Sequence, residues 1–192
     1  MNIHLSDTLC LLQQPFSKAQ PESGMTNWMA DAVVRNAQTF CSFDACVLSY
    51  ELLSCAYLPP GPLCRRDMYR LIEQDDALGL LELDGRQLQL LCDSIASVGG
   101  MPLSGMKFSI AAKKAVNVHI KDKVLHPDLV YRILLNKGLL QSRGMPAFVY
   151  HNKHWRFCCP SVRYLLISDL ENASQHQTLL KNSTDQRISY DD

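Results

Sequence analysis

The sequence lacks the features that would place the chain in a special structural class. No apolar run approaches the roughly 20 residues that a membrane-spanning helix needs, since the longest runs, such as 78–81 and 133–135, are short. The 19 basic and 19 acidic side chains leave no net charge, so overall charge points to no partner. A hydrophobic share of 47% with 20% charged residues excludes a chain that is disordered, collagen-like or coiled coil throughout. At 192 residues the chain is long enough to bury a substantial core without disulfides or metals.

Signals of export are scarce as well. Residues 1–12 contain Asp7 but no Lys or Arg, so they lack the basic start of a signal peptide. The eight cysteines form no C-x-x-C pair, and their spacing does not resemble the framework of a small secreted disulfide protein. We therefore expect reduced thiols, and Cys92, which lies in an apolar helical pattern, is expected to be buried.

The neutral total hides an uneven distribution of charge. Residues 101–160 contain ten Lys or Arg and two Asp, whereas residues 1–100 contain six Lys or Arg and twelve Asp or Glu. Two interpretations stay open: the segments neutralise each other in the fold, or the basic segment forms a face that attracts phosphate or an acidic partner. The basic residues fall on expected strands and turns without interleaved aromatic side chains, so we expect no nucleic-acid binding.

The hydrophobic spacing predicts short strands and helices that intermix along the chain. A helix is expected to start at Asp84, with Gln87 three residues later as in a capping box, and to end at Gly99–Gly100. Its inner face is expected to carry Leu88, Leu91, Cys92 and Ile95. The expected strands are 5–12, 45–49, 78–83, 107–111, 116–120 and 131–135, and the other expected helices are 25–38 and 161–170. Residues 67–72 are expected to form a short helix or a turn.

Three further segments complete this interpretation. Residues 58–62 read Leu-Pro-Pro-Gly-Pro and are expected to form a turn. Residues 148–151 and 154–158 alternate around Asn152–Lys153 and are expected to form a hairpin. The polar residues from 171 onward are expected to be loosely held. The whole pattern predicts an α+β fold: a single compact domain with a mixed sheet and packed helices.

Several short motifs follow one another with nearly constant spacing over residues 5–188. Residues 22–32 read E-S-G-M-T-N-W-M-A-D-A, and the later motifs are Gly61-Pro62-Leu63 with Asp67-Met68-Tyr69, Glu82-Leu83-Asp84-Gly85, Ser104-Gly105-Met106-Lys107-Phe108, Leu125-His126-Pro127-Asp128 with Tyr131, and Arg187-Ile188. In this order they resemble the C-terminal domain of the 5′-nucleotidase family. In that family the domain follows a two-metal phosphatase domain and binds the nucleoside part of the substrate.

The resemblance implies how the chain is organised. Residues 1–188 would form a 5′-nucleotidase C-terminal-like domain and residues 189–192 a polar tail, which leaves no room for the phosphatase domain. The chain is therefore expected to have no catalytic residues and no cofactor of its own, and divalent metals are expected only if a separate metallophosphatase chain supplies the site. In the first helix, we expect Asp31 to hydrogen-bond a neighbouring turn and Trp28 to lie in the core.

The chain departs from the family pattern where the family recognises its substrate. The family's N-G-G-G-I-R falls on residues 50–55, which offer neither glycines for a close backbone approach nor an arginine for phosphate. The family's P-F-G-N falls on residues 73–76, which lack the phenylalanine that stacks on the nucleobase. If the pocket binds a nucleoside- or nucleotide-like ligand, these positions and two further residues are expected to contact it: Tyr50, Glu51, Cys55, Gln74, Asn136 and Arg143.

The charges at these positions leave the ligand open. Glu51 would repel phosphate, and together with Gln74 it suits a neutral or cationic polar ligand. Arg65, Arg66 and Arg143 would favour phosphate if they turned toward the pocket. Aromatic contact is expected from Tyr50 or Tyr57, unless they pack against the Pro59–Pro60 turn.

Two other groups of residues suggest chemistry of their own. His151-x-x-His154 followed by Cys158-Cys159 contains residue types that bind zinc. Adjacent residues of a strand point to opposite faces, so the two cysteines are not expected to share a metal, and we expect no metal site. Cys55 has no cationic sequence neighbour that would activate its thiol.

The sequence leaves three functions open. The first is a free-standing, non-catalytic module that binds a ligand or a partner protein. The second is the substrate-recognition subunit of a 5′-nucleotidase or phosphoesterase whose metallophosphatase domain is a separate chain. The third is a binding module on an unrelated α+β fold. The resemblance implies export, whereas the cysteines and the missing signal peptide favour the cytoplasm, so the compartment is undetermined.

Overall fold

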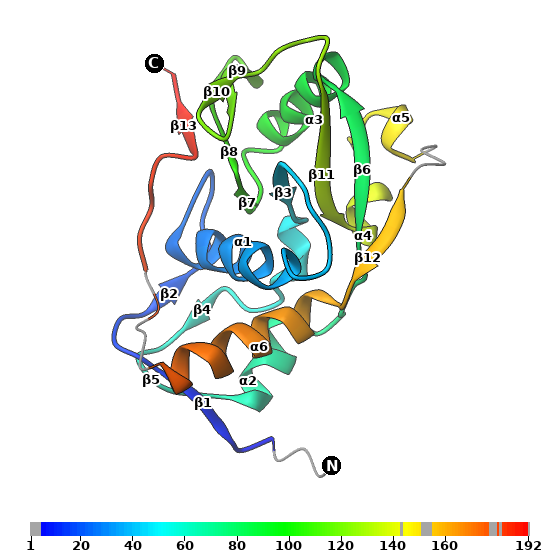
Figure 1. Ribbon diagram of the computed structural model, residues 1–192. Helices are drawn as coiled ribbons and strands as arrows, with labels where there is room; N and C mark the ends of the chain where they lie inside the picture. The colour runs from blue at the N-terminus through cyan, green and yellow to red at the C-terminus, as the bar shows by residue number, and fades with distance from the viewer. Residues whose placement is uncertain (1–4, 143, 151–154, 177–179, 181, 192) are drawn as a thin grey trace.

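A five-stranded mixed sheet forms the centre of the molecule (Figure 1). The computed structural model describes residues 5–142, 144–150, 155–176, 180 and 182–191. The strand order is β12-β6-β11-β3-β7, with β11 parallel to β3 and antiparallel to β6. The five strands are β3 (Ala45–Val47), β6 (Leu78–Asp84), β7 (Leu103–Ser104), β11 (Val130–Asn136) and β12 (Arg156–Cys159).

Both faces of this sheet are buried, because successive side chains of a strand enter different cores. Cys46 and Leu134 pack into one core, while Ala45, Ile133 and Leu135 pack into the other. In Figure 1 the helices of the first core lie in the lower half and the elements of the second in the upper half. The first includes α1 (Gly24–Ala37), α2 (Arg65–Leu71) and α6 (Val162–Gln175), and the second includes α3 (Gly85–Ser97), β8 (Met106–Ala111) and β9 (Lys114–Ile120).

Smaller elements complete the two halves. A four-stranded sheet has the order β10-β9-β8-β13, and two-stranded sheets join β1 to β5 and β2 to β4. The remaining strands are β1 (Thr8–Leu12), β2 (Phe16–Ser17), β4 (Tyr57–Leu58), β5 (Gly61–Cys64), β10 (Lys123–Val124) and β13 (Ile188–Tyr190), and the short helices are η1 (Tyr50–Leu52), α4 (Lys137–Leu140) and α5 (Ala147–Tyr150).

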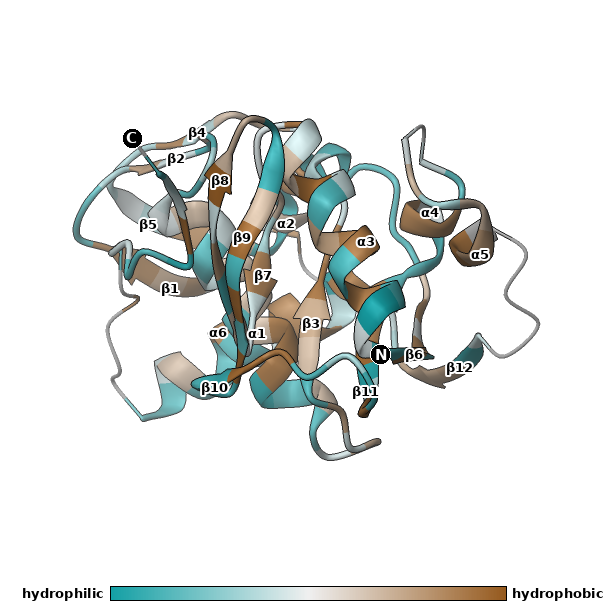
Figure 2. Cartoon of the chain, turned by 90° about the horizontal axis from the view of Figure 1, so that it is seen from above, coloured by the Kyte–Doolittle hydropathy of each residue, from teal (hydrophilic) through white to brown (hydrophobic). Residues whose placement is uncertain are grey.

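Local capping explains where the two long central helices begin. Ser23 Oγ accepts the backbone N–H of Thr26 at 3.2 Å at the start of α1. Asp84 Oδ1 accepts the N–H of Gln87 at 2.8 Å, and Gln87 Oε1 accepts the N–H of Asp84 at 3.1 Å, which confirms the predicted capping box. Figure 2 shows hydrophobic and hydrophilic bands alternating along α3. Its expected inner face is buried, as predicted: Leu88, Leu91, Cys92 and Ile95.

The turn expected over residues 58–62 is shorter than predicted. Gly61 and Pro62 belong to β5, where they pair with Leu12 and Leu11 of β1. A proline is tolerated there because β5 pairs with a single strand and can leave the proline nitrogen on its unpaired side. Only Pro59 and Pro60 separate β4 from β5.

The hairpin expected over residues 148–158 is wrong. Residues 147–150 form the helical turn α5, and β12 pairs with β6 at the edge of the central sheet. A four-residue apolar pattern does not distinguish a strand from a helical turn, and the partner of β12 is distant in sequence. Residues 151–154, including the expected turn and both histidines, lie outside the described residues.

The polar segment after residue 170 is also more ordered than expected. Helix α6 continues to Gln175, and β13 pairs in parallel with β8. The expected boundary between a domain ending at 188 and a tail over 189–192 falls inside β13. The described residues thus form one compact domain with helices packed on mixed sheets, as the sequence predicted. None of the helices they contain is long and apolar enough to cross a membrane.

The acidic and basic segments of the chain contact each other directly. Lys121 Nζ lies 3.0 Å from Asp44 Oδ1, and Arg86 Nη2 lies 2.8 Å from Asp128 Oδ1. Asp44 and Arg86 come from the acidic first half and their partners from the basic segment. The Lys121–Asp44 pair supports the interpretation that the two segments neutralise each other within the fold. The Arg86–Asp128 pair joins the minority charge of each segment and leaves their excess charges unchanged.

Candidate functional site

Three loops meet at one edge of the central sheet. The first follows β3 and contains η1, the second precedes β6 over residues 72–77, and the third follows β11. Strands β3 and β11 are parallel, and β6 is antiparallel to β11. The carboxyl ends of β3 and β11 therefore lie at the same edge as the amino end of β6. We call this edge, formed by residues 49–55, 72–77 and 136–142, the loop edge. Five of the six residues that the sequence indicated as ligand contacts lie on it: Tyr50, Glu51, Cys55, Gln74 and Asn136.

A buried hydrogen-bond network holds the loop edge together. Asn136 is fully buried, and its Oδ1 accepts the backbone N–H of Ser49 at 2.8 Å. Its Nδ2 donates to Asp76 Oδ2 at 2.7 Å and to Ser49 Oγ at 3.1 Å. Asp76 Oδ2 also accepts the N–H of Gly138 at 2.6 Å. Asn136 therefore connects the three loops, and its amide uses both of its polar atoms within the protein.

Tyr50 faces a cation that the sequence gave no reason to expect there. Lys18 Nζ lies 4.0 Å from the centre of the Tyr50 ring, a cation–π distance, and donates to the carbonyl of Leu53 at 2.8 Å. Burial lowers the pKa of Lys18, against the opposing charge of Glu51, and burial raises the pKa of Tyr50. No motif links Lys18 to the loop edge, because it lies at the end of β2, far from η1 in sequence.

The remaining predicted contacts differ in exposure. Glu51 and Gln74 are exposed, and Cys55 is half-buried. The Cys55 thiol donates to the carbonyl of Tyr57 at 3.0 Å. Tyr57 is 51% exposed and lies on β4. Arg143 lies outside the described residues.

The arginines considered as substitutes for the family's phosphate ligand are placed differently. Arg65 forms an ion pair with Glu171 of α6, so it is directed toward that helix. Arg66 is exposed in the first turn of α2. Arg163, at the start of α6, was not considered from the sequence. Its guanidinium donates to the carbonyls of Ile72 at 2.7 Å and Glu73 at 3.0 Å.

The charge of the loop edge is therefore mainly negative. Its described residues include three exposed carboxylates, Glu51, Glu73 and Asp75, and one exposed ammonium, Lys137. Lys18 and Arg163 lie beside the loops, where they donate to backbone carbonyls, and their charges offset part of this excess. Exposed carboxylates repel an anionic group within the Debye length, so this surface disfavours phosphate.

A second polar region lies away from the loop edge, between α1, α6 and the segment that leads to β13. It encloses a cavity of about 670 Å³ whose lining includes Trp28, Asp31, Arg35, Asp169 and Arg187. Arg35 pairs with Asp169 at 2.9 Å and Arg187 with Asp31 at 2.7 Å. These pairs join the three segments, so we assign them to the stability of the fold. Asp31 also accepts Ser104 Oγ at 2.7 Å.

The fold is that of the C-terminal domain of 5′-nucleotidases, as the sequence motifs indicated. No protein-family model and no curated protein matches the sequence. Among solved structures, the chain is similar to a 5′-nucleotidase precursor from Thermus thermophilus, with a TM-score of 0.82 and 14% identity, over 96% of this chain and 39% of that one. It is also similar to an NAD nucleotidase from Haemophilus influenzae (TM-score 0.71, 12% identity, 97% and 38%) and to a sulfate thiohydrolase from Thermus thermophilus (TM-score 0.71, 15% identity, 97% and 35%).

The chain thus spans less than half the length of each of these structures. TM-scores of 0.71–0.82 establish a shared fold, although the identities are only 12–15%, and fold does not by itself establish function. The names of the three proteins include two nucleotidases and one enzyme that acts on a different substrate. Function must therefore be argued from the loop edge itself.

Proposed function

We propose that this chain is a 5′-nucleotidase C-terminal-like domain that binds a ligand or a partner protein at its loop edge and does not hydrolyse nucleotides by itself. The observation that carries the proposal is the convergence of the three loops through Asn136, Asp76 and Ser49. The network lies among the positions onto which the sequence resemblance maps the family's substrate-binding motifs. The exposed side chains on top of it are no longer those that bind a nucleotide.

The ligand is a neutral or cationic polar group rather than a phosphate. Exposed carboxylates outnumber exposed cations among the described residues of the loop edge, and Gln74 offers both donors and acceptors. The ring of Tyr50 is covered on one face by Lys18, so it is not set up for stacking on a nucleobase from that face. Tyr50, Glu51, Cys55, Gln74 and Arg143 are the proposed contacts, and Asn136 positions the loops that carry them.

Titration calorimetry with AMP and adenosine tests this proposal. We expect AMP to bind with a millimolar Kd at best, which corresponds to about 4 kcal/mol. Glu51→Gln should strengthen AMP binding because it removes a repelling charge. Glu82→Gln is the matched control, since Glu82 is exposed on β6 and lies outside the loop edge. Micromolar AMP binding that is lost in Arg143→Ala would show a rebuilt phosphate site and would contradict the proposal.

The absence of hydrolysis has a separate basis. Within the described ranges, only one group of three or more His, Cys, Asp or Glu side chains is placed to share a metal, and it consists of cysteines. Two-metal phosphoryl transfer needs metals about 4 Å apart that clamp the attacking and leaving oxygens. We expect no phosphate release from AMP with added Mg²⁺, Mn²⁺ or Zn²⁺. Metal-dependent release that follows the protein through successive purification steps would contradict this part of the proposal.

A second candidate function follows from the length of the similar structures. They are more than twice as long as this chain, so the loop edge could complete an active site together with a metallophosphatase domain on another chain, which would supply the divalent metals. Mixing the two chains tests this alternative. AMP or sugar-nucleotide hydrolysis that rises on addition of this chain, and falls again with Glu51→Lys or Gln74→Ala, would favour it.

A further inference from the structure

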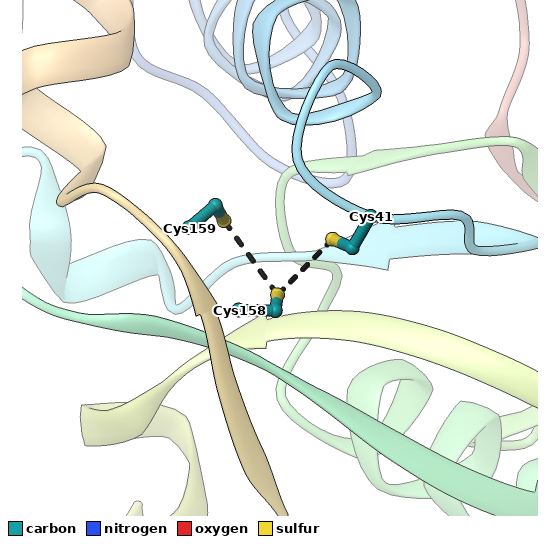
Figure 3. Close-up of side chains that lie close together, drawn as sticks. All are labelled: Cys41, Cys158 and Cys159. Atoms are coloured by element: carbon teal, nitrogen blue, oxygen red, sulfur yellow. Dashed lines mark hydrogen bonds between the residues drawn. The ribbon is translucent and has the colours of Figure 1, made fainter.

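Three cysteine thiols from two distant segments converge on one point (Figure 3). Cys41 comes from the loop after α1, and Cys158 and Cys159 come from β12. Cys41 Sγ lies 3.1 Å from Cys158 Sγ, and Cys158 Sγ lies 3.7 Å from Cys159 Sγ. All three sulfurs lie within 4.8 Å of one another. We call these residues the thiol cluster.

A β-bulge explains how adjacent cysteines share one side of a strand. In the pairing of β12 with β6, Phe157 lies opposite Gly79 and Cys159 lies opposite Leu78, so Cys158 is the extra residue. A bulge re-aims the side chain at its extra position and is common next to functional sites. The sequence-based argument that Cys158 and Cys159 cannot share a metal assumed a regular strand, and the irregular register removes it.

The position of Cys41, the third residue of the cluster, is fixed by the end of α1. The backbone N–H of Cys41 donates to the carbonyl of Ala37 at 3.1 Å, so this bond ties Cys41 to the last residue of α1. Cys41 and Cys158 are half-buried, whereas Cys159 is buried in the core. The cluster therefore has an apolar floor and a side that reaches solvent.

The thiols are not arranged as nucleophiles. Burial raises the pKa of Cys158, and the neighbouring thiols add to the shift; burial also raises the pKa of Cys159 to about 11. A reactive cysteine needs a cationic setting that lowers its pKa instead. A metal cation at the centre would supply the positive charge that three converging sulfurs lack.

We propose that the thiol cluster is a zinc site with three thiolate ligands. Zn–S bonds of about 2.3 Å at tetrahedral angles place two ligand sulfurs roughly 3.8 Å apart. The Cys158–Cys159 separation of 3.7 Å matches this value, whereas Cys41 and Cys158, at 3.1 Å, would move apart when the ion binds. Binding replaces three S–H bonds by three Zn–S bonds and releases three protons to the solvent. The fourth position faces the open side, where water can occupy it.

The charge balance favours a divalent over a monovalent ion. Three thiolates with Zn²⁺ leave one net negative charge, whereas three thiolates with Cu⁺ leave two. Burying uncompensated charge is costly, and Cys159 sits in the apolar core. Soft thiolates select zinc and Cu⁺ over Mg²⁺ or Ca²⁺, so the site is not a remnant of oxygen-ligated phosphatase chemistry.

Metal titration of the reduced, chelator-stripped chain tests the assignment. We expect one Zn²⁺ per chain, measured in competition with a colorimetric zinc chelator. Co²⁺ in the same site should show the near-ultraviolet charge-transfer absorption of cobalt–thiolate bonds. Because changes beyond the ligand shell already cost about 10–100-fold in metal affinity, Cys41→Ser and Cys158→Ser should each weaken zinc binding at least about 100-fold.

Controls keep the test specific to the cluster. Cys10→Ser changes a half-buried thiol outside both the cluster and the loop edge and should leave zinc affinity unchanged. Cys41→Ala serves as a second variant if Cys41→Ser fails to fold, and circular dichroism verifies each protein. The proposal fails if the parent binds no zinc after full reduction, or if a Cys41→Ser/Cys158→Ser double variant binds it equally. A Cys41–Cys158 disulfide in the isolated protein, with no zinc uptake after reduction, would also overturn it.

Discussion

Both terminal nitrogens of Arg187 donate hydrogen bonds to the carboxylate of Asp31. Nη1 donates to Asp31 Oδ1 at 2.8 Å and Nη2 donates to Asp31 Oδ2 at 2.7 Å. Nη1 also donates to the carbonyl of Leu103 at 2.9 Å, and Nε donates to Asp185 at 2.7 Å. This one side chain connects the segment before β13 to α1 and to β7. Asp31 of α1 thus holds the segment before β13 and strand β7 against the helix. The sequence analysis expected a structural role for this residue.

Arg187→Ala should destabilise the protein markedly without changing its ligand binding. The Arg187 side chain is 14% exposed, and hydrogen bonds to charged groups contribute about 1.5–3 kcal/mol each to stability. Because Asp31 would keep Ser104 as a partner, we expect a total loss of about 2–3 kcal/mol in urea unfolding.

The control for that experiment is Arg86→Ala. The Arg86–Asp128 pair has a similar length, 2.8 Å, but its side chains are 74% and 63% exposed, and exposed pairs contribute about 0–1 kcal/mol. An equal loss of unfolding free energy in the two variants would show that the Asp31–Arg187 pair stabilises the fold no more than an exposed ion pair does.

The same segment shows where sequence reasoning failed. Residues after 170 are polar, and polarity without periodicity is typical of a loose tail. Here two of the polar residues form ion pairs within the fold: Arg187 bonds to Asp185 and to Asp31 of α1. Such long-range pairs leave no periodic pattern, so the sequence motif Arg187-Ile188 was a better guide than the composition.

Trp28→Ala should destabilise the core strongly. Trp28 is 4% exposed, and its ring meets the edge of Phe16 with centroids 5.9 Å apart. Truncating a buried Trp costs about 3–5 kcal/mol. Denaturant unfolding measures the loss, and a melting temperature within a degree or two of the parent would contradict the core assignment.

Trp28→Phe separates the contribution of the aromatic ring to stability from that of the indole N–H group. The indole N–H is buried and has no hydrogen-bond partner within the part of the chain that the structure describes. Its loss should therefore cost little beyond the smaller volume, less than half the effect of Trp28→Ala. A larger effect would reveal a partner for the indole nitrogen.

Stability should fall in acid because several carboxylates, Asp44 and Asp185 among them, are held ionised in the folded state. Burial alone would raise the pKa of Asp44 and Asp185, but both pKa values lie below 3.8, the ordinary value of an aspartate side chain. The backbone N–H of Arg132 and the charge of Lys121 outweigh burial at Asp44, and Arg187 does so at Asp185. The unfolded chain therefore binds more protons, so this stability is present above pH 3.8 and is lost as the pH falls through 3.8 toward the folded pKa values.

Urea unfolding between about pH 6 and pH 3 measures this loss. Asp185→Asn should make the decline shallower, because it removes one of the groups that take up a proton on unfolding. A decline as steep as that of the parent would mean that other carboxylates dominate.

The fold was largely readable from the sequence, whereas the details of both sites were not. Apolar periodicity and capping residues place α1, α3, β6 and β11, because these elements bury one face or two in the cores. The bulge at Cys158 and the approach of Lys18 to Tyr50 depend on pairing between distant segments. A single sequence does not encode such pairings in any local pattern.

Asn136→Asp should be the most damaging small change at the loop edge. The substitution keeps the size of the side chain but replaces the Nδ2 donor, which lies 2.7 Å from Asp76 Oδ2, with a carboxylate oxygen. Two carboxylates would then face each other at a fully buried position, and an uncompensated buried charge costs about 3–5 kcal/mol. Ser49→Ala is the matched control, because it removes a single hydrogen bond of 3.1 Å and should cost about 1 kcal/mol. The deficit of Asn136→Asp should shrink as the pH falls from about 7 to 5, since protonation of either carboxyl restores a donor and ends the repulsion. A deficit equal to that of Ser49→Ala and independent of pH would show that Asn136 does not hold the three loops together.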